Sequence, residues 1–449
     1  MKKKFLCSVL AVAMFLMVFT FVGCSGTESS SPTSSAGQQS GKAVTIRVLA
    51  NFSDAAQSAS FAERLKKFQE ENTNIVIDDW STGDETVFND KFKTAVAQGD
   101  PPEIFVNYGG VSQVDYAKNK IMADLTDVLN SDKAWSDKIP VSLFNDWKYS
   151  DIEGVYGIPY ASFGIGIFYN KNLFTQIGSE PPETIEEFME ASEKFIAKGI
   201  TPLAIGDKDI FRGGHLLSSL SMKAYGSQKT LDLCSRQAKW NDADMLSLFQ
   251  LVKDMQDKGV FGQNVVTLDY NAEKAAFESG KSAMHMDGTW YFGSALSSSI
   301  ADQIGFIPFP YFKDKPEYQK SWMGGATGAF CMSGLAKDGK KDAAVKLLKF
   351  ISSQEHFKYM WEQTNGGFIP PMSLDDLGID QSTVPALTKN FLEKFSEVTD
   401  LRNEIGVYDP MSQLTTKVRE EIQGLFAGNT PKGTADNIQK EIDNYEANK

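Results

Sequence analysis

The sequence predicts an α/β protein with at least two lobes. Residues 44–50 (VTIRVLA) alternate like a strand, residues 59–70 carry apolar side chains at helical spacing, and residues 74–78 (NIVID) form a second strand-like run. A strand, a helix and a strand in this order predict a parallel βαβ unit. The chain beyond residue 42 comprises roughly 400 residues, which exceeds what one hydrophobic core usually supports, so two lobes are expected.

The remaining elements follow from periodicity and turn residues. Amphipathic spacing predicts helices over 88–97, 185–197, 241–258, 272–279, 341–352, 354–364, 412–427 and 434–444. Apolar runs predict strands over 103–106, 164–170, 282–286, 305–309 and 328–332. The turn residues near 157–160 mark a first crossing between lobes. We therefore assign residues 43–157 with about 305–355 to an N-terminal lobe, and 158–304 with about 356–449 to a C-terminal lobe.

The amino terminus predicts export. Three lysines precede an apolar run over residues 5–22, and a Ser-rich tether over residues 24–42 follows. The junction of Gly23 and Cys24 resembles a bacterial lipobox, with Phe21 where that motif usually has Leu. The resemblance implies a signal peptide over residues 1–23, acylation of Cys24 and a lipid-anchored protein on the outer face of the cell membrane. An uncleaved membrane anchor is the alternative, because about 18 apolar residues are the lower limit for crossing a bilayer.

The charge and cysteine content narrow the function classes. Lys and Arg number 45 and Asp and Glu 58, which gives a formal net charge of −13. Nucleic acid is therefore not an expected partner. Cys234 and Cys331 remain after the leader, and they either pair or stay as buried free thiols.

Seven motifs occur in an order that resembles bacterial extracellular solute-binding proteins of family 1, the maltose-binding-protein-like capture components of ABC sugar importers. They lie at residues 44–52, 92–105 (FKTAVAQGDPPEIF), 154–174, 181–188 (PPETIEEF), 275–290 (AAFESGKSAMHMDGTW), 304–310 and 322–330. Glu103 and Ile185 depart from the usual Asp and Trp at positions not expected to touch ligand. The resemblance implies a two-lobed periplasmic-binding-protein-like fold of type II, with the ligand between lobes joined by crossover segments. It also implies a carbohydrate ligand, ABC permease partners, a monomer, no cofactor and no metal.

The candidate ligand-binding residues combine aromatic rings with polar groups after predicted strands. Sugars present C–H faces to aromatic rings and hydroxyls to carboxylates and amides. By motif position, Trp290 is the expected stacking platform and Asp287 the expected hydroxyl acceptor. The other candidates are Asn51, Phe52, Ser53, Tyr108, Gly109, Tyr160, Phe163, Phe211, Arg212, Trp322, Gly325, Tyr408 and Asp409.

An enzyme is the main alternative, in the form of a surface-anchored glycoside hydrolase with two carboxylates about 5 to 10 Å apart. The sequence contains no G-x-S-x-G, P-loop, H-E-x-x-H or C-x-x-C motif, and we expect no catalytic residues. His285 either lines the cleft or packs within a strand. A sugar-sensing protein with the same fold is a further alternative.

Overall fold

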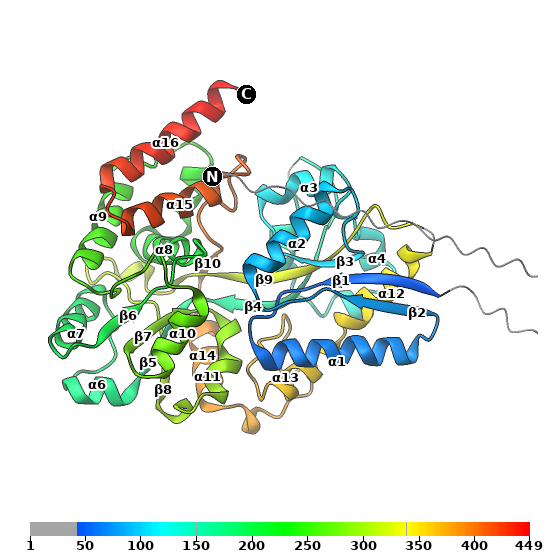
Figure 1. Ribbon diagram of the computed structural model, residues 1–449, viewed down its shortest axis with the longest axis horizontal. Coiled ribbons are helices and arrows are strands. Elements are labelled where there is room, and N and C mark those ends of the chain that lie inside the picture. Colours follow the sequence, from blue (N-terminus) through cyan, green and yellow to red (C-terminus); the bar gives the residue numbers. More distant parts are fainter. Residues whose placement is uncertain (1–42, 150, 338) are drawn as a thin grey trace, which may run out of the picture. The chain divides into compact units, whose positions relative to one another are not determined.

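Two open β-sheets with flanking helices form the part of the chain that the structure describes (Figure 1). This computed structural model describes residues 43–149, 151–337 and 339–449. The predicted signal peptide, Cys24 and the whole tether lie outside the described residues. Within the described ranges, no helix combines the length and apolar character that crossing a bilayer requires.

The first sheet has six strands and contains the predicted βαβ unit. Its strands are β1 (Val44–Leu49), β2 (Ile75–Asp79), β3 (Ile104–Asn107), β4 (Ile158–Gly164), β9 (Ser321–Met332) and β10 (Asp400–Arg402). Strand β1 pairs in parallel with β2 and β3, which confirms the predicted unit, and β9 runs antiparallel to β3 and β4. Because β1 and β3 are parallel, Asn51 and Tyr108 follow them at the same edge of the sheet.

The second sheet has four strands in the order β6-β7-β5-β8. They are β5 (Gly166–Asn170), β6 (Thr201–Ala204), β7 (Ser282–Asp287) and β8 (Ile304–Pro308). Strand β7 is central and every residue in it is buried, as its apolar run predicts. Its carboxyl end leads directly into the short 3₁₀ turn η3 (Thr289–Tyr291), which places Trp290 at the edge of this sheet.

Two crossing segments join the sheets side by side. Only Ile165 separates β4 in the first sheet from β5 in the second, and the chain returns between β8 and β9. The backbone N–H of Ile165 donates to the carbonyl of Met323 at 2.9 Å, which ties the two crossings together. Figure 1 shows β4 and β9 running together across the middle of the molecule. Rotation of one lobe against the other would bend the chain here.

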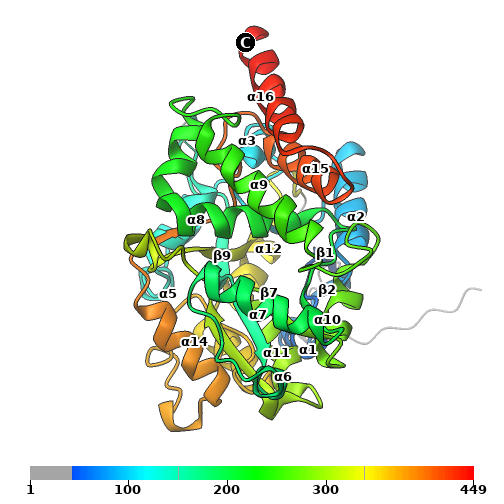
Figure 2. The same ribbon diagram turned by 90° about the vertical axis from the view of Figure 1, so that its left-hand side faces the viewer.

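Helices flank both sheets. Around the first sheet lie α1 (Ala55–Glu71), α2 (Glu85–Ala97), α3 (Val114–Lys118), α4 (Thr126–Asn130), α5 (Lys133–Ser136), α12 (Lys340–Ile351) and α13 (Gln354–Gln363). The remaining helices are α6 (Lys171–Ile177), α7 (Ile185–Ala197), α8 (Phe211–Cys234), α9 (Ala243–Asp257), α10 (Tyr270–Glu278), α11 (Phe292–Ser297), α14 (Ala386–Ser396), α15 (Leu414–Phe426) and α16 (Pro431–Ala447). Helices α15 and α16 lie beside α8 and α9 (Figure 2).

Side-chain caps explain where several helices start. Asp54 accepts from the N–H of Gln57 at the start of α1, and Asp84 does the same for Val87 at the start of α2. Helix α7 begins with a capping box between Thr184 and Glu187. The caps of α1 and α2 fix the turns that follow β1 and β2. Residues in or next to these two turns belong to the candidate site described below.

The predicted lobe boundaries are wrong in several places, among them the start of the C-terminal lobe, because residues 158–164 form β4 of the first sheet. Residues 304–308 form β8, which pairs with β5 in the second sheet and not with the N-terminal lobe. Helix α13, assigned to the C-terminal lobe, packs on α1, and its Phe357 joins the same hydrophobic cluster as Phe61. The lobe to which a strand belongs depends on its hydrogen-bonded partner, and the lobe of a helix depends on the surface against which it packs. Neither can be read from the periodicity of the sequence.

The two cysteines beyond the leader are free thiols. Cys331 lies in β9 and Cys234 ends α8, and both are buried. Burial raises the pKa of both thiols, so neither is a reactive thiolate near neutral pH.

Candidate functional site

A series of aromatic rings connects the two sheets. The ring centroid of Trp290 lies 5.6 Å from that of Phe163, next to the crossing strands, and 5.9 Å from that of His215 on α8. His215 lies 5.3 Å from Phe211 at the start of the same helix. Trp290 is half-buried and packs against the hydrophobic clusters of both lobes. The structure thus brings Phe163, Phe211 and Trp290 together, as the sequence predicts.

A second group lies at the carboxyl ends of β1 and β3. The Tyr108 hydroxyl donates to Glu85 Oε2 at 3.0 Å and accepts from Asn51 Nδ2 at 3.0 Å, and Asn51 also donates to Glu85. Tyr108 is 36% exposed, although both Glu85 and Asn51 hold its hydroxyl. Burial raises the pKa of Glu85, and its hydrogen bonds with Tyr108 and Asn89 only partly offset this. Glu85 therefore fixes the side chains of Tyr108 and Asn51, two of the predicted ligand-binding residues.

A third group lies beside the crossing strands. The Asn403 side chain donates to Asp146 Oδ2 at 3.1 Å, and the Tyr408 hydroxyl accepts from the N–H of Asn403 at 3.2 Å. Gly325 has φ +154°, a conformation that favours glycine, and a Cβ there would make only ordinary contacts, 3.9 Å from Asp146 and 3.8 Å from Phe163. Gly109 has φ +71°, and a Cβ there would clash with Asp146 at 2.8 Å, so this glycine leaves room for Asp146. This group links Tyr108 to the aromatic series and brings Gly109, Gly325 and Tyr408 close to Asp146.

The charged side chains of Glu404 and of Arg419 on α15 lie beside His215, at one end of the aromatic series. Arg419 donates through Nε to Glu404 at 2.9 Å, and His215 Nε2 lies 3.9 Å from Glu404. Burial, together with the positive charge of Arg212 and Arg419, holds the pKa of His215 well below its usual range. His215 is therefore neutral near pH 7, and it can either donate or accept a hydrogen bond.

Asp287 and Arg212 do not contact solvent, and the prediction that they bind ligand directly is wrong for this structure. Both are fully buried, and the Asp287 carboxylate accepts from Arg212 Nη1 at 3.2 Å and from the Tyr270 hydroxyl at 2.7 Å. Arg212 also donates to Glu273 at 2.7 Å, and His285 lies between the two carboxylates. These five side chains form the buried ionic cluster beneath Trp290. His285 thus packs within its strand.

Four further candidates belong to the cores. Trp322 is 3% exposed and packs against Phe391 and Phe395, and Tyr160 and Phe52 pack on each other 5.5 Å apart. Asp409 is fully buried and bound by Arg236. Their assignment to the ligand is therefore wrong for this structure, because glycine neighbours and aromatic character also suit a packed strand. Ser53 is half-buried and makes no side-chain hydrogen bond within the described residues.

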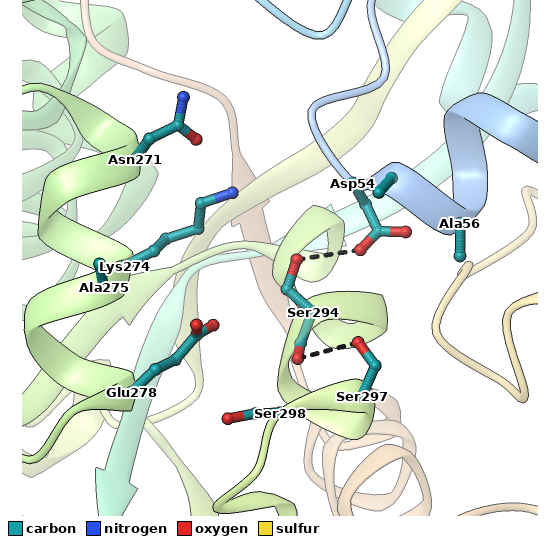
Figure 3. A pocket seen from close by; sticks show the side chains of 10 residues that line it. Asp54, Ala56, Asn271, Lys274, Ala275, Glu278, Ser294, Ser297 and Ser298 are labelled. Atoms are coloured by element: carbon teal, nitrogen blue, oxygen red, sulfur yellow. Dashed lines mark hydrogen bonds between the residues drawn. The ribbon is translucent and has the colours of Figure 1, made fainter.

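A polar pocket of about 280 Å³ lies between the start of α1 and the helices α10 and α11 (Figure 3). It is lined by Asp54, Ala55, Ala56, Asn271, Lys274, Ala275, Glu278, Ser294, Ser297 and Ser298. The Ser294 hydroxyl donates to Asp54 Oδ2 at 2.9 Å, which joins α11 to the start of α1. In Figure 3 the Lys274 side chain extends from α10 into the space in front of Asp54.

Sequence reasoning missed several polar residues of the site. Glu85, Asp146, Glu404, Arg419 and Lys274 lie in helices or turns that carry no aromatic motif. A carboxylate at the first position of a helix, as Glu85 is in α2, usually indicates only a stabilised helix terminus. Within the described ranges, no group of three or more His, Cys, Asp and Glu side chains is arranged to hold a metal ion.

The chain is similar to sugar-binding proteins in sequence. Residues 53–356 match the family described as bacterial extracellular solute-binding protein. The multiple sugar-binding protein of Streptococcus mutans is 26% identical over 258 residues, which are 56% of this chain and 59% of that protein, less than two thirds of its length. The melibiose/raffinose/stachyose-binding protein of Bacillus subtilis is 22% identical over 364 residues, 80% of this chain and 79% of the relative.

Solved structures share the fold. A chitin oligosaccharide binding protein superposes with a TM-score of 0.82 at 26% identity, covering 91% of this chain and all of that one. A solute-binding protein in complex with raffinose gives a TM-score of 0.70 at 19% identity, covering 88% and 98%. The predicted fold, two α/β lobes of the periplasmic-binding-protein-like type II, is confirmed by these likenesses and by the two open sheets.

Proposed function

Because the chain belongs to the bacterial extracellular solute-binding protein family, we propose that it captures a carbohydrate, an oligosaccharide by preference, and delivers it to the permease of an ABC transporter. The observation that carries this proposal is the position of Trp290. Its ring packs against the hydrophobic clusters of both lobes and is flanked by Phe163 and His215 at 5.6 and 5.9 Å. A half-buried indole between two lobes offers an apolar face to the C–H surface of a sugar ring.

Polar groups suited to hydroxyls lie at the carboxyl ends of β1 and β3 and near the crossing strands. Tyr108 and Asn51 present a phenol and an amide whose orientation Glu85 holds. Near the crossing strands, the Asp146 carboxylate accepts from Asn403 and keeps capacity for further donors. A ligand with a stacked ring and several hydroxyls would use both kinds of contact, whereas an apolar ligand would leave these polar groups without partners.

Closure of the lobes would complete the site. The strands that cross between lobes meet at Ile165 and Met323, where closure would bend the chain. A ligand that contacts Tyr108 in one lobe and Trp290 in the other favours the closed state by its differential affinity. The closed, ligand-loaded form is the shape that a permease would recognise.

The relatives named above support sugar as the ligand class. They include proteins named for binding multiple sugars and for binding melibiose, raffinose and stachyose. A thermal-shift screen of the purified protein against maltose, maltotriose, raffinose, stachyose, xylotriose and chitotriose tests the proposal directly. We expect at least one oligosaccharide to raise the unfolding midpoint in a concentration-dependent way. No shift with any sugar, together with a shift for an amino acid or a peptide, would contradict it.

Catalysis is tested with the same sugars. Prolonged incubation of pure protein with each sugar that binds should release no new reducing ends. Release of new reducing ends would show that the protein is a glycoside hydrolase and would contradict the proposed capture function.

We also propose that the protein acts as a monomer held by a lipid on Cys24 at the outer face of the cell membrane. The apolar run over residues 5–22, followed by Gly23 and Cys24, supports this. A lipid anchor would keep a capture protein beside its permease. Mass spectrometry of the amino terminus tests it: we expect a diacylglyceryl group on Cys24, and an intact residue 1 would contradict it.

A further inference from the structure

One face of helix α8 joins the candidate site to a strand that crosses between the lobes. His215, Ser219 and Lys223 are spaced by four residues, so they share this face. The His215 ring lies 5.9 Å from that of Trp290, and the Ser219 hydroxyl lies 3.9 Å from the sulfur of Met323 on β9. A displacement of α8 from β9 would therefore also move His215 relative to Trp290.

Lys223 is buried at the contact between α8 and β9 and has no acidic partner. Its side chain is 1% exposed. Its ammonium donates to the carbonyl of Gln319 at 2.6 Å, two residues before β9, and lies 5.6 Å from the centre of the Trp322 ring on β9. Within the described residues it forms no ion pair, whereas the ammonium of Lys229 on the same helix is held by two carboxylates. An ammonium has three donors, and this one has a single hydrogen-bond acceptor.

The charged groups around α8 do not offset the charge of Lys223. Asp400 on β10 accepts from the backbone N–H of Ser227 at 2.8 Å, and Lys320, just before β9, pairs with Glu397 at 3.5 Å. The other charged or titratable side chains that face α8 are Lys315 and Tyr318 before β9, Asp244 on α9, Glu404, and Arg419 on α15. Burial alone acts on Lys223, and it lowers the pKa of this amine from 10.5 to about 7.

We propose that Lys223 is a proton-sensitive contact between α8 and the crossing strand β9, and that its protonation lowers the affinity of the candidate site. The proposal rests on the proposed function, because it acts on ligand binding beside Trp290. Gln319 is exposed, so a small displacement of α8 from β9 admits water, which supplies the acceptors that the ammonium lacks. The neutral amine needs no such acceptors, and α8 then stays packed on β9 with His215 beside Trp290.

Calorimetry at about pH 6 and about pH 8.5 tests this contact. The probe is whichever of maltotriose, raffinose, stachyose, xylotriose and chitotriose binds the wild type most tightly. We expect wild-type affinity to be at least roughly fivefold lower at pH 6, the lower end of typical couplings between two sites. Lys223→Met, similar in length but never charged, should bind within about twofold at the two pH values. Lys239→Met, at an exposed position shortly after α8, should keep the wild-type pH dependence.

Unfolding without ligand tests the protonation of Lys223 separately. Because its folded pKa lies below the unfolded value of 10.5, the cost of burying the ammonium is full below about pH 7 and fades as pH rises to about 10. Lys223→Met should therefore raise the unfolding midpoint more at about pH 6 than at about pH 9.5.

The outcomes separate this contact from the capture function. An equal gain in unfolding midpoint at both pH values, or the same pH dependence of affinity in the wild type and Lys223→Met, would overturn the contact and leave the capture function intact. If no sugar binds the wild type, the capture function and the effect on affinity both fall, whatever the unfolding comparison shows.

Discussion

Arg212 Nη1 lies 3.2 Å from the carboxylate of Asp287, and neither side chain has any exposed surface. Arg212 also binds Glu273 at 2.7 Å, and His285 lies 2.8 Å from Asp287 and 2.9 Å from Glu273. The two carboxylates raise the pKa of His285, and with His285 protonated the cluster holds two positive and two negative groups. Its place directly below the turn that carries Trp290 makes it a support for the site and not a ligand contact.

Loss of Arg212 should therefore destabilise the fold. Arg212→Gln leaves two buried carboxylates with only His285 as counter-charge, and removing one partner of a buried ion pair costs about 3–5 kcal/mol. Urea unfolding monitored by circular dichroism measures the loss. Lys208→Gln, at an exposed position near the start of the same helix, serves as the control. Unchanged stability with abolished sugar binding would instead restore Arg212 as a direct contact.

The same cluster should make stability depend on pH. Burial alone would lower the pKa of His285, but the carboxylates of Asp287 and Glu273 outweigh it and raise the pKa above its usual value of 6.5. The contribution of His285 is thus fully present below about pH 6.5 and is lost as pH rises through its folded pKa. Arg212 and His285 outweigh burial and lower the pKa of Asp287 and of Glu273, so the contribution of the acids is lost as pH falls.

Comparison with His285→Gln isolates this effect. The difference in unfolding free energy between the wild type and this variant should be larger at about pH 5.5 than at about pH 8.5, because the imidazolium is lost at the higher pH. Urea titrations at the two pH values measure it. A difference that stays constant across this range would show that folding does not shift the pKa of His285, and a smaller difference at the lower pH would show that His285 is neutral in the folded protein.

Asp207 should act in the opposite sense, as a destabilising carboxyl. It is fully buried, its Oδ2 has no hydrogen-bond partner within the described residues, and burial raises its pKa from 3.8 to about 7. Since the folded pKa lies above the unfolded one, stability is lost as pH rises from about 4 to 7. Asp207→Asn should stabilise the protein at pH 8 by up to about 4 kcal/mol and have little effect at pH 4. Equal effects at both pH values would contradict this.

Glu85 should affect ligand affinity more than stability. Its Oε2 accepts from both Tyr108 and Asn51 and its Oε1 accepts from Asn89, so the amide nitrogen of Glu85→Gln must face a donor at one of these two positions. We expect sugar affinity to fall by about 0.5–1.5 kcal/mol, the net value of one hydrogen bond. Calorimetry with the best sugar from the thermal-shift screen measures it, with Asp90→Asn on the exposed side of α2 as the control. Equal affinities in the two variants would remove Glu85 from the site.

Much of the fold could be predicted from the sequence, because most of its elements carry clear periodicity. Helix α7 occupies the predicted residues 185–197, and β1, β2 and β3 form the predicted parallel unit. Helix α8 gave no such signal. It is buried on nearly all sides and contains Gly213, Gly214 and several buried serines, so no polar face alternates with an apolar one. This helix supplies Phe211, Arg212 and His215.

The candidate site was predicted only in part for a related reason. A motif identifies which residues follow a strand, so Trp290, Tyr108 and Asn51 could be placed at strand ends. It does not distinguish an aspartate that faces solvent from one that faces a buried arginine 75 positions away, as Asp287 does. Such pairings depend on long-range packing, which has no local pattern.

The most direct test of the account is the affinity of Trp290→Ala for the sugar that gives the largest thermal shift, compared by calorimetry with the wild type and with Trp80→Ala. Trp80 is a half-buried tryptophan just after β2. Loss of the stacking face should weaken binding by about 1–3 kcal/mol, or roughly 5- to 150-fold, while Trp80→Ala binds like the wild type. Unchanged affinity in a folded Trp290→Ala variant would contradict the central claim that this ring is the platform on which the sugar stacks.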